Sequence, residues 1–218
     1  MISNFNNKSV CLYTYPMKML YTLIGIILLA FIVIQVFAFK SQRDIEMYPY
    51  TVNKKYDGFE IRSYDATLFT SVKLSTNEYK NASSTGFRIL AGYIFGGNER
   101  NEKIAMTSPV AMSLEDSMTM MFMVPKKYKK DMLPRPNASN IKFTEEPAKV
   151  VAAITFSGWA NDQNIEEYKQ KLIVALNKEG IPYTNKFYFL GYNPPFELVN
   201  RRNEVIVELQ GEALKGIK

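Results

Sequence analysis

The chain has 218 residues, no histidine and a single cysteine, Cys11, which precedes a long apolar segment. The part after residue 40 therefore cannot form an internal disulfide, a Cys/His zinc site, a Ser-His-Asp triad or a cysteine nucleophile. Lys8, Lys18 and Lys40 are the only charged side chains before residue 41, so 24 basic and 21 acidic side chains remain after it. So weak a basic balance does not indicate a nucleic-acid partner.

The first predicted element is an uncharged apolar run, residues 20–39. Its length suits a membrane-spanning helix, which needs about 20 residues, and exceeds a signal-peptide core of roughly 7–15 residues. We predict an N-terminal extension, 1–19, followed by a single-pass transmembrane anchor or signal-anchor. Cleavage after Ala38 is the alternative, because Val36-Phe37-Ala38 offers small residues at the required positions. The short basic segment Met17-Lys18-Met19 and this cleavage site favour an extracytoplasmic position for the rest, whereas the count of Lys and Arg near the two ends of the run does not favour a cytoplasmic N-terminus, so the alternative topology stays open.

Residues 40–49 are predicted to be a polar linker, residues 50–211 one domain, and residues 212–218 a tail. In the domain, apolar side chains at every second position from Leu68 to Leu74 predict a strand. Ser75-x-x-Glu78 has the form of a capping box and predicts the start of a helix, which Gly96-Gly97 would end. The apolar stripe of this helix consists of Phe87, Leu90, Ala91 and Ile94, and a strand over residues 118–124 follows.

A second region repeats this order. A strand over residues 150–156 precedes a helix over residues 165–176, and two strands, 187–190 and 203–209, flank a proline turn at Asn193-Pro194-Pro195. The halves, about 50–125 and 141–211, therefore suggest an internal duplication. The predicted fold is α+β: a distorted antiparallel β-barrel of two βαββ repeats with two flanking helices, in which the cleft between the halves is a common place for a ligand. Two unrelated α+β stretches are the alternative.

Two further segments have a plain and a sharper interpretation. The connection from Pro125 to Pro147, with its run Lys126-Lys127-Tyr128-Lys129-Lys130, is interpreted as a solvated loop. The alternative is a patch that binds anionic lipid headgroups. The methionine-rich run, 106–123, is interpreted as soft core filling rather than metal ligation, because its spacing is that of a strand.

Several motifs then carry a resemblance to a known family. They are Phe59-Glu60-Ile61-Arg62, Gly92-Tyr93-Ile94-Phe95-Gly96-Gly97-Asn98, Ile104-Ala105-Met106-Thr107-Ser108-Pro109-Val110, Gly191-Tyr192-Asn193-Pro194-Pro195-Phe196 and Arg201-Arg202-Asn203-Glu204-Val205. In this order they resemble the SOUL haem-binding protein family over about residues 50–210. The resemblance implies the barrel described above and the binding of haem or free porphyrins.

The resemblance also implies where a porphyrin would bind, namely against the first helix and the loop after the second proline turn. The matching residues here are Arg88, Ile89, Gly92, Tyr93, Tyr192, Pro195 and Phe196. Aromatic side chains offer flat apolar faces, arginine can pair with a propionate, and glycine permits close approach of a ring. Some members have lysine where this chain has Tyr93 and Glu197. Since histidine is absent, iron would be ligated by Tyr, Met or Lys, or the ring would be held by packing alone.

Some of these residues also have a purely structural interpretation. Ile89, Tyr93 and Phe196 are also typical of ordinary packing. Arg201 and Arg202 are predicted to fix the last turn through carbonyl or carboxylate contacts. The adjacent acids Glu166 and Glu167 are interpreted as an exposed first helical turn, so no catalytic residue and no metal ligand is assigned.

The sequence therefore predicts a membrane-anchored protein that binds haem or another tetrapyrrole and acts as a carrier, buffer or scavenger. Haem is a possible and not an obligatory cofactor, and no enzymatic activity is expected. The alternative is an effector-sensing or protein-interaction module that binds another apolar ligand in the same cleft. The oligomeric state is not predicted.

Overall fold

The computed structural model describes residues 14–42, 45–115, 117–194, 197 and 200–211, and the chain divides into two compact units, Met1–Asp44 and Ile45–Lys218. The first unit contains one helix, α1 (Thr14–Gln42), which includes the predicted apolar run. Within α1, the segment Met17–Gln35 is exposed and has a mean hydropathy of 2.4, so it is long and apolar enough to cross a membrane. A signal sequence would have the same properties.

The second unit combines eleven strands with helices in the part of the chain that the structure describes. The helices are α2 (Tyr79–Ile94), α3 (Asp162–Lys178) and the short 3-10 helix η1 (Lys130–Met132). The strands are β1 (Glu46–Met47), β2 (Tyr50–Lys55), β3 (Glu60–Tyr64), β4 (Thr67–Lys73), β5 (Thr107–Ser108), β6 (Val110–Ser113), β7 (Thr119–Met123), β8 (Ile141–Glu146), β9 (Lys149–Ser157), β10 (Tyr183–Gly191) and β11 (Arg202–Leu209).

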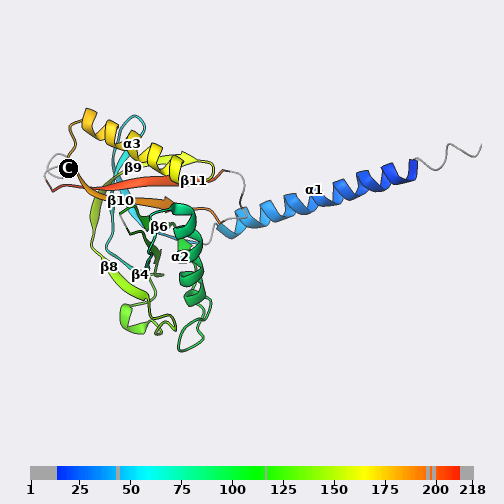
Figure 1. Cartoon of the computed structure of the whole chain (residues 1–218), viewed down its shortest axis with the longest axis horizontal. Coiled ribbons are helices and arrows are strands. Elements are labelled where there is room, and N and C mark those ends of the chain that lie inside the picture. Colours follow the sequence, from blue (N-terminus) through cyan, green and yellow to red (C-terminus); the bar gives the residue numbers. More distant parts are fainter. Residues whose placement is uncertain (1–13, 43–44, 116, 195–196, 198–199, 212–218) are drawn as a thin grey trace, which may run out of the picture. The chain divides into compact units, whose positions relative to one another are not determined.

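Nine of these strands form one curled antiparallel sheet in the order β2-β3-β9-β11-β10-β6-β7-β4-β8 (Figure 1). The order is symmetric about the β10–β6 pair except for one additional edge strand: β11, β9, β3 and β2 follow on one side, and β7, β4 and β8 on the other. Two βαββ halves would produce this order, but their origin by duplication stays a prediction. The predicted α+β class, with helices on an antiparallel half-barrel, is confirmed.

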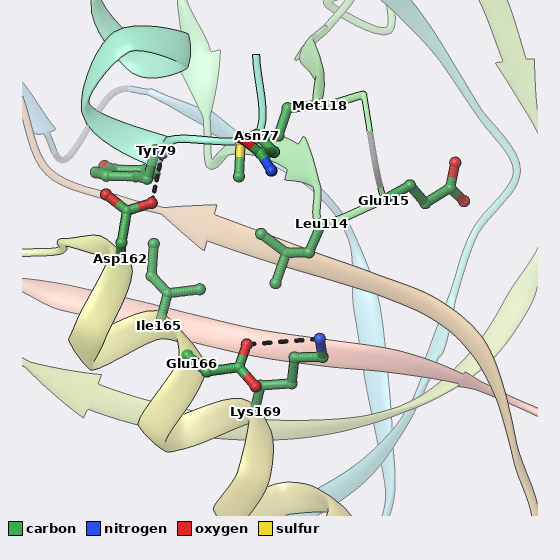
Figure 2. A pocket seen from close by; sticks show the side chains of 9 residues that line it. All are labelled: Asn77, Tyr79, Leu114, Glu115, Met118, Asp162, Ile165, Glu166 and Lys169. Carbon is green, nitrogen blue, oxygen red and sulfur yellow. Dashed lines mark hydrogen bonds and ion pairs between the residues drawn. The ribbon is translucent and has the colours of Figure 1, made fainter.

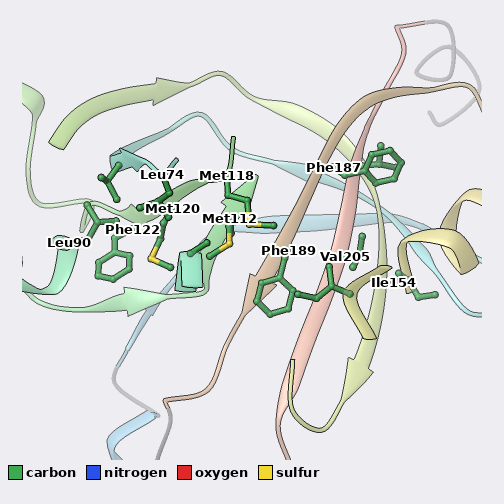
Figure 3. Packing of buried hydrophobic residues seen from close by; sticks show 14 of the residues in the cluster. Leu74, Leu90, Met112, Met118, Met120, Phe122, Ile154, Phe187, Phe189 and Val205 are labelled. Atoms are coloured by element: carbon green, nitrogen blue, oxygen red, sulfur yellow. The ribbon is translucent and has the colours of Figure 1, made fainter. Parts of the chain in front are cut away.

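One face of the sheet is covered by helices. Helix α2 packs on β4 and β7, and α3 packs on β9, β10 and β11 (Figure 1). The side chains between them form what we call the helix-covered core. Its main members are Phe59, Ile61, Val72, Leu74, Leu90, Met112, Met118, Met120, Phe122, Ile154, Phe156, Leu172, Leu176, Phe187, Phe189, Val205 and Val207 (Figure 3). Met112, Met118 and Met120 are buried in this core with Leu74 and Leu90, and Met121 and Met123 are buried on the other face of the sheet, which confirms that the methionine-rich run fills the core.

The opposite face of the sheet encloses a second cluster, which we call the strand-enclosed core. Among the described residues its members come from strands and adjacent loops rather than from helices: Tyr48, Tyr64, Phe69, Ala111, Met121, Met123, Val151, Ala153, Leu190, Tyr192 and Ile206. Since no helix contributes to it, the curl of the strands is what removes these side chains from water. Small barrels are filled by their own side chains in this way.

Two local predictions were wrong. The capping box does not form, because α2 begins at Tyr79 and the N-cap residue Glu78 makes no side-chain cap. Instead, Asp162 at the start of α3 accepts a 2.6 Å hydrogen bond from the Tyr79 N–H, so a tertiary contact replaces the local one. The connection between the halves is also not a loop throughout, because β8 pairs with β4. The polar side chains of this edge strand mask the alternation of Ile141 and Phe143.

The N-terminal boundary of the domain lies close to residue 45. Strand β1, which falls in the predicted linker 40–49, pairs in parallel with β5 through Glu46 opposite Thr107 and Met47 opposite Ser108. The next residue, Tyr48, is buried in the strand-enclosed core. The chain therefore becomes part of the domain a few residues before the predicted start at residue 50.

Candidate functional site

The outer face of α2 contains three of the predicted porphyrin contacts. Arg88 and Gly92 are exposed and lie one helical turn apart, and Ile89 is half-buried beside them. No atom lies within 4 Å of a Cβ built on Gly92, so the helix surface is open at this point. Phe95, one further turn along the same face, is 62% exposed. This face of α2 therefore combines one guanidinium, that of Arg88, with the apolar residues Ile89, Gly92 and Phe95.

Arg88 is available for an external partner. It makes no hydrogen bond or ion pair with the residues that the structure describes. Its guanidinium could therefore pair bidentately with a carboxylate of a bound molecule. Phe95 was not among the predicted contacts, although an exposed aromatic residue directly before Gly96-Gly97 was a visible signal.

Tyr93, the fourth predicted residue on α2, points inward. Its side chain is buried in the helix-covered core, and its hydroxyl donates a 3.0 Å hydrogen bond to the carbonyl of Pro134. Burial raises the pKa of Tyr93 to about 12. In this arrangement Tyr93 anchors the end of α2 to the connection between the halves.

The other predicted contacts follow β10. Tyr192 is buried in the strand-enclosed core, and its hydroxyl donates a 2.8 Å hydrogen bond to Oε2 of Glu204. Pro195 and Phe196 lie outside the described residues. Because Tyr93 and Tyr192 belong to different cores, the structure does not bring these two side chains together.

Arg201 fixes the last turn, as the sequence predicted, whereas the Arg202 side chain binds residues of the sheet. Nη1 of Arg201 donates to the carbonyls of Pro194 at 3.0 Å and Glu197 at 2.7 Å, and its guanidinium lies 4.2 Å from the ring centre of Trp159. Arg202 instead donates to a carboxylate, that of Glu204, through Nη2 at 2.6 Å. Arg201 therefore joins the described residues of the loop between β10 and β11.

A buried ionic network, which sequence reasoning did not find, surrounds Glu204. Its carboxylate is fully buried and accepts hydrogen bonds from Nη1 of Arg62 at 2.9 Å and from Arg202, Tyr192 and Thr155. Burial alone would raise the pKa of Glu204, but the charges of Arg62 and Arg202 outweigh it and hold that pKa below its ordinary value. Arg62 and Glu204 lie 142 positions apart, which hides the pairing in the sequence.

A cavity of about 330 Å³ lies between the starts of α2 and α3 (Figure 2). It is lined by Asn77, Tyr79, Leu114, Glu115, Met118, Asp162, Ile165, Glu166 and Lys169. Its carboxylates have structural partners, since Asp162 caps α2 and Glu166 lies 3.5 Å from Lys169, while Glu115 extends away from the other lining residues. None of the predicted contacts lines this cavity.

A second cavity, of about 530 Å³, lies between the β2–β3 turn and α3, and no predicted contact lines it either. On the nearby surface of α3, Glu167 pairs with Lys171 at 2.6 Å. Glu166 and Glu167 are both exposed, as predicted, but α3 begins at Asp162, so they lie in its second turn and not in its first.

Comparison with known proteins agrees with this architecture. The chain is 31% identical to heme-binding protein 2 of Homo sapiens over 166 residues, covering 72% of this chain and 80% of that protein. It is 30% identical to heme-binding protein 2 of Mus musculus over 177 residues, covering 77% and 82%. The crystal structure of the EcmrR C-terminal domain shares the fold, with a TM-score of 0.57 and 11% identity over 74% of this chain and 98% of that one.

The family model described as SOUL heme-binding protein matches residues 45–208, which is nearly the whole second unit. Its first matched residue is also the first residue of that unit. The matched residues therefore include the curled sheet, α2, α3 and the buried network around Glu204. On this match, and on the identity to the two mammalian proteins, the chain belongs to the SOUL heme-binding protein family.

Proposed function

We propose that this protein is a membrane-anchored tetrapyrrole carrier, buffer or scavenger that holds haem on the outer face of α2 without histidine ligation. The observation that carries the proposal is the open surface at Gly92 in a member of a heme-binding family. A planar ring can approach a helix backbone closely only where side chains are missing. The proposal also includes the extracytoplasmic position of the domain and single-pass attachment through α1.

The residues on this face fit a porphyrin. Exposed Phe95 and half-buried Ile89 supply apolar contact area, and Arg88 supplies one charge for a propionate. Because the hydroxyls of Tyr93 and Tyr192 are both engaged in hydrogen bonds, packing and the propionate contact hold the ring. Pro195 and Phe196 would complete the contact from the loop. A binding role is favoured over catalysis because the cavity carboxylates Asp162 and Glu166 serve the helices.

The test is a hemin titration of the full chain in detergent, followed through the Soret band. The Gly92→Leu variant is expected to weaken binding at least about tenfold, because a side chain would occupy the space of the ring, a cost of about 1.4 kcal/mol. The variant should still fold, since nothing lies near the new Cβ. Gln163→Leu, at an exposed position of α3, adds the same apolar group elsewhere and should bind hemin like the original chain.

Two results would count against the proposal. A hemin affinity equal in Gly92→Leu and Gln163→Leu would place the ring elsewhere. The absence of any saturable Soret change in the original chain would reject haem binding and leave the alternative of another apolar ligand, which native mass spectrometry of protein from its own host would identify. A carrier, unlike a protein with a permanent cofactor, should also pass bound hemin to apomyoglobin on mixing.

A further inference from the structure

Two loops at the C-terminal end of α2 form a separate lobe of the domain (Figure 1). They are residues 95–106, which follow α2, and residues 125–137, which follow β7 and include η1. We call them together the basic lobe. Several contacts join them: Glu99 exchanges hydrogen bonds with Arg135, through the Glu99 N–H at 3.0 Å and the Glu99 Oε1 at 3.1 Å. The two loops are therefore joined by hydrogen bonds into one structural unit.

The interior of the lobe is fixed by a buried asparagine. Asn98 is 1% exposed, and its amide group donates to the carbonyls of Tyr93 and Glu102 at 3.1 Å and 2.8 Å. Next to it, a Cβ on Gly97 would lie 2.6 Å from the carbonyl oxygen of Gly92, so only glycine permits this close approach. Since the lobe is ordered by its own contacts, its surface charges are held in place.

The positive charge of the domain is concentrated on this lobe. The two loops contain seven basic and three acidic side chains, whereas the rest of residues 41–218 contains 17 basic and 18 acidic ones. The acids of the lobe are largely used inside it: Glu102 accepts a hydrogen bond from the Tyr128 hydroxyl at 2.8 Å and lies 3.5 Å from Nε of Arg100, and Glu99 holds Arg135.

Most of the basic side chains are by contrast directed to solvent, and only Arg100 among the described ones also contacts Glu102 and the carbonyl of Met132 within the lobe. The exposed ones are Arg100, Lys103, Lys126, Lys127, Lys129, Lys130 and Arg135. Of the four lysine ammonium groups in the run 126–130, only that of Lys130 pairs with a carboxylate among the described residues, Glu145 at 3.0 Å, while Glu46 accepts a hydrogen bond from the backbone N–H of Lys126. Two apolar side chains accompany this charge, because Phe95 is 62% exposed and Met132 is 49% exposed. Exposed lysines beside exposed apolar groups match the chemistry of an anionic lipid surface, which offers negative headgroups above an apolar layer.

We propose that the basic lobe rests on an anionic lipid bilayer, an inference that depends on the membrane anchor proposed above and not on the extracytoplasmic position of the domain. The linker favours it, since only residues 43–45 separate α1 from β1 and they keep the domain close to the membrane. The seven cations supply attraction to the headgroups, and Met132 enters the interface. The lobe thereby fixes which side of the domain faces the lipid.

The experiment uses the full chain with Cys11→Ser and Met132→Cys, labelled at the new cysteine with an environment-sensitive fluorophore. The chain is placed in nanodiscs of phosphatidylcholine alone or of phosphatidylcholine mixed with phosphatidylserine. We expect a blue shift only with phosphatidylserine, reversed by high salt because screening weakens charge attraction. A fluorophore at Val174→Cys, on exposed α3, should not respond.

The triple variant Lys126→Gln, Lys127→Gln, Lys129→Gln should lose the shift. Each lysine near an anionic surface contributes about 1 kcal/mol, so docking should weaken by about 100-fold. The matched control, Lys73→Gln, Lys80→Gln, Lys178→Gln, removes three exposed lysines elsewhere on the domain and should retain it.

Other outcomes would overturn the inference. An equal shift in neutral and anionic discs, or the same shift with duplex DNA in place of phosphatidylserine, would mean that lipid charge is not what the lobe recognises. No shift in discs that retain the protein would also reject it. If the chain does not stay with the discs, the anchor proposal fails instead. Flotation of the chain with phosphatidylserine vesicles then tests the basic lobe by itself. Binding to the vesicles would support the lipid contact, and no binding would reject it.

Discussion

The two faces of the nine-stranded sheet are packed with side chains of different chemistry. The helix-covered core consists of aliphatic, aromatic and methionine side chains that α2 and α3 close off. The strand-enclosed core adjoins tyrosines and a fully buried carboxylate, Glu204, with its two arginines. Adjacent residues of one strand serve the two faces: Val205 lies in the first core and Glu204 beside the second.

The two faces are therefore stabilised by different interactions, apolar burial on one and paired buried charges on the other. The helix-covered core is held by apolar burial, which tolerates changes of shape as long as the volume is kept. Around Glu204 every partner is needed, because a buried charge that loses its counter-charge is costly. The network is also incomplete at its border, since the buried hydroxyls of Tyr48 and Tyr64 have no hydrogen-bond partner in the described part of the chain.

The largest effect is expected from breaking the ionic network. Glu204→Gln should lower the free energy of unfolding by about 3 kcal/mol, because buried Arg62 would keep only the partly exposed Glu60 as a negative partner and the half-buried Arg202 would keep none. Chemical denaturation followed by circular dichroism measures this change.

The control is the double variant Arg62→Met, Glu204→Leu, which removes the pair together. It should recover part of the loss, because apolar replacement of both partners is often neutral. A single variant as stable as the original chain would show that the network contributes nothing.

A smaller loss is expected in the helix-covered core. Leu172 of α3 is fully buried, and Leu172→Ala should cost about 3 kcal/mol through lost burial and a cavity. Met112→Leu, which keeps the volume, should cost less than about 1.5 kcal/mol. Denaturant midpoints of the two variants separate these outcomes. Equal losses would mean that this core depends on exact shape rather than on apolar volume.

The two cores should also differ in their response to acid. The pKa values of Glu204 and Glu208 lie below the ordinary 4.5: burial opposes this, but Arg62 and Arg202 around Glu204, and Lys149 and Lys186 around Glu208, outweigh it. Carboxylates with lowered pKa values stabilise the fold above pH 4.5, and this contribution is lost as the pH falls below that value.

Stability of the original chain should therefore fall below pH 4.5, and the fall should be shallower in Glu204→Gln, which has lost one such carboxylate. Thermal unfolding over a pH series measures the slopes. Parallel curves for the two proteins would exclude a role of Glu204. Leu172→Ala, which changes no charge, should run parallel to the original chain.

The sequence predicted the apolar face better than the polar one. Period-two and helical patterns located the main strands and both helices, because apolar burial leaves a periodic trace. The pairing of Arg62 with Glu204 leaves no periodic pattern in the sequence. It joins β3 to β11, which are not paired with each other but lie on either side of β9. For the candidate site, Arg88 and Gly92 could be placed on one helical face, whereas the inward direction of Tyr93 depends on the loop around Pro134, which no local pattern contains.

The smallest change in stability is expected from alanine substitutions at two glycines of α2 that lie on different sides of the helix. Gly92 faces solvent, and Gly92→Ala should stabilise the fold by about 1 kcal/mol, because alanine favours a helix and nothing obstructs its methyl group. At Gly86 the same methyl group would lie 3.0 Å from Leu74 and Met120 in the helix-covered core, so crowding should outweigh the helix propensity. Thermal unfolding of the two variants should give shifts of opposite sign. Equal stabilisation by both substitutions would mean that the side chains under α2 move aside more readily than their packing indicates. If Gly92→Ala stabilises the fold and also weakens hemin binding, Gly92 lowers the stability of the helix and favours a ligand on its open face.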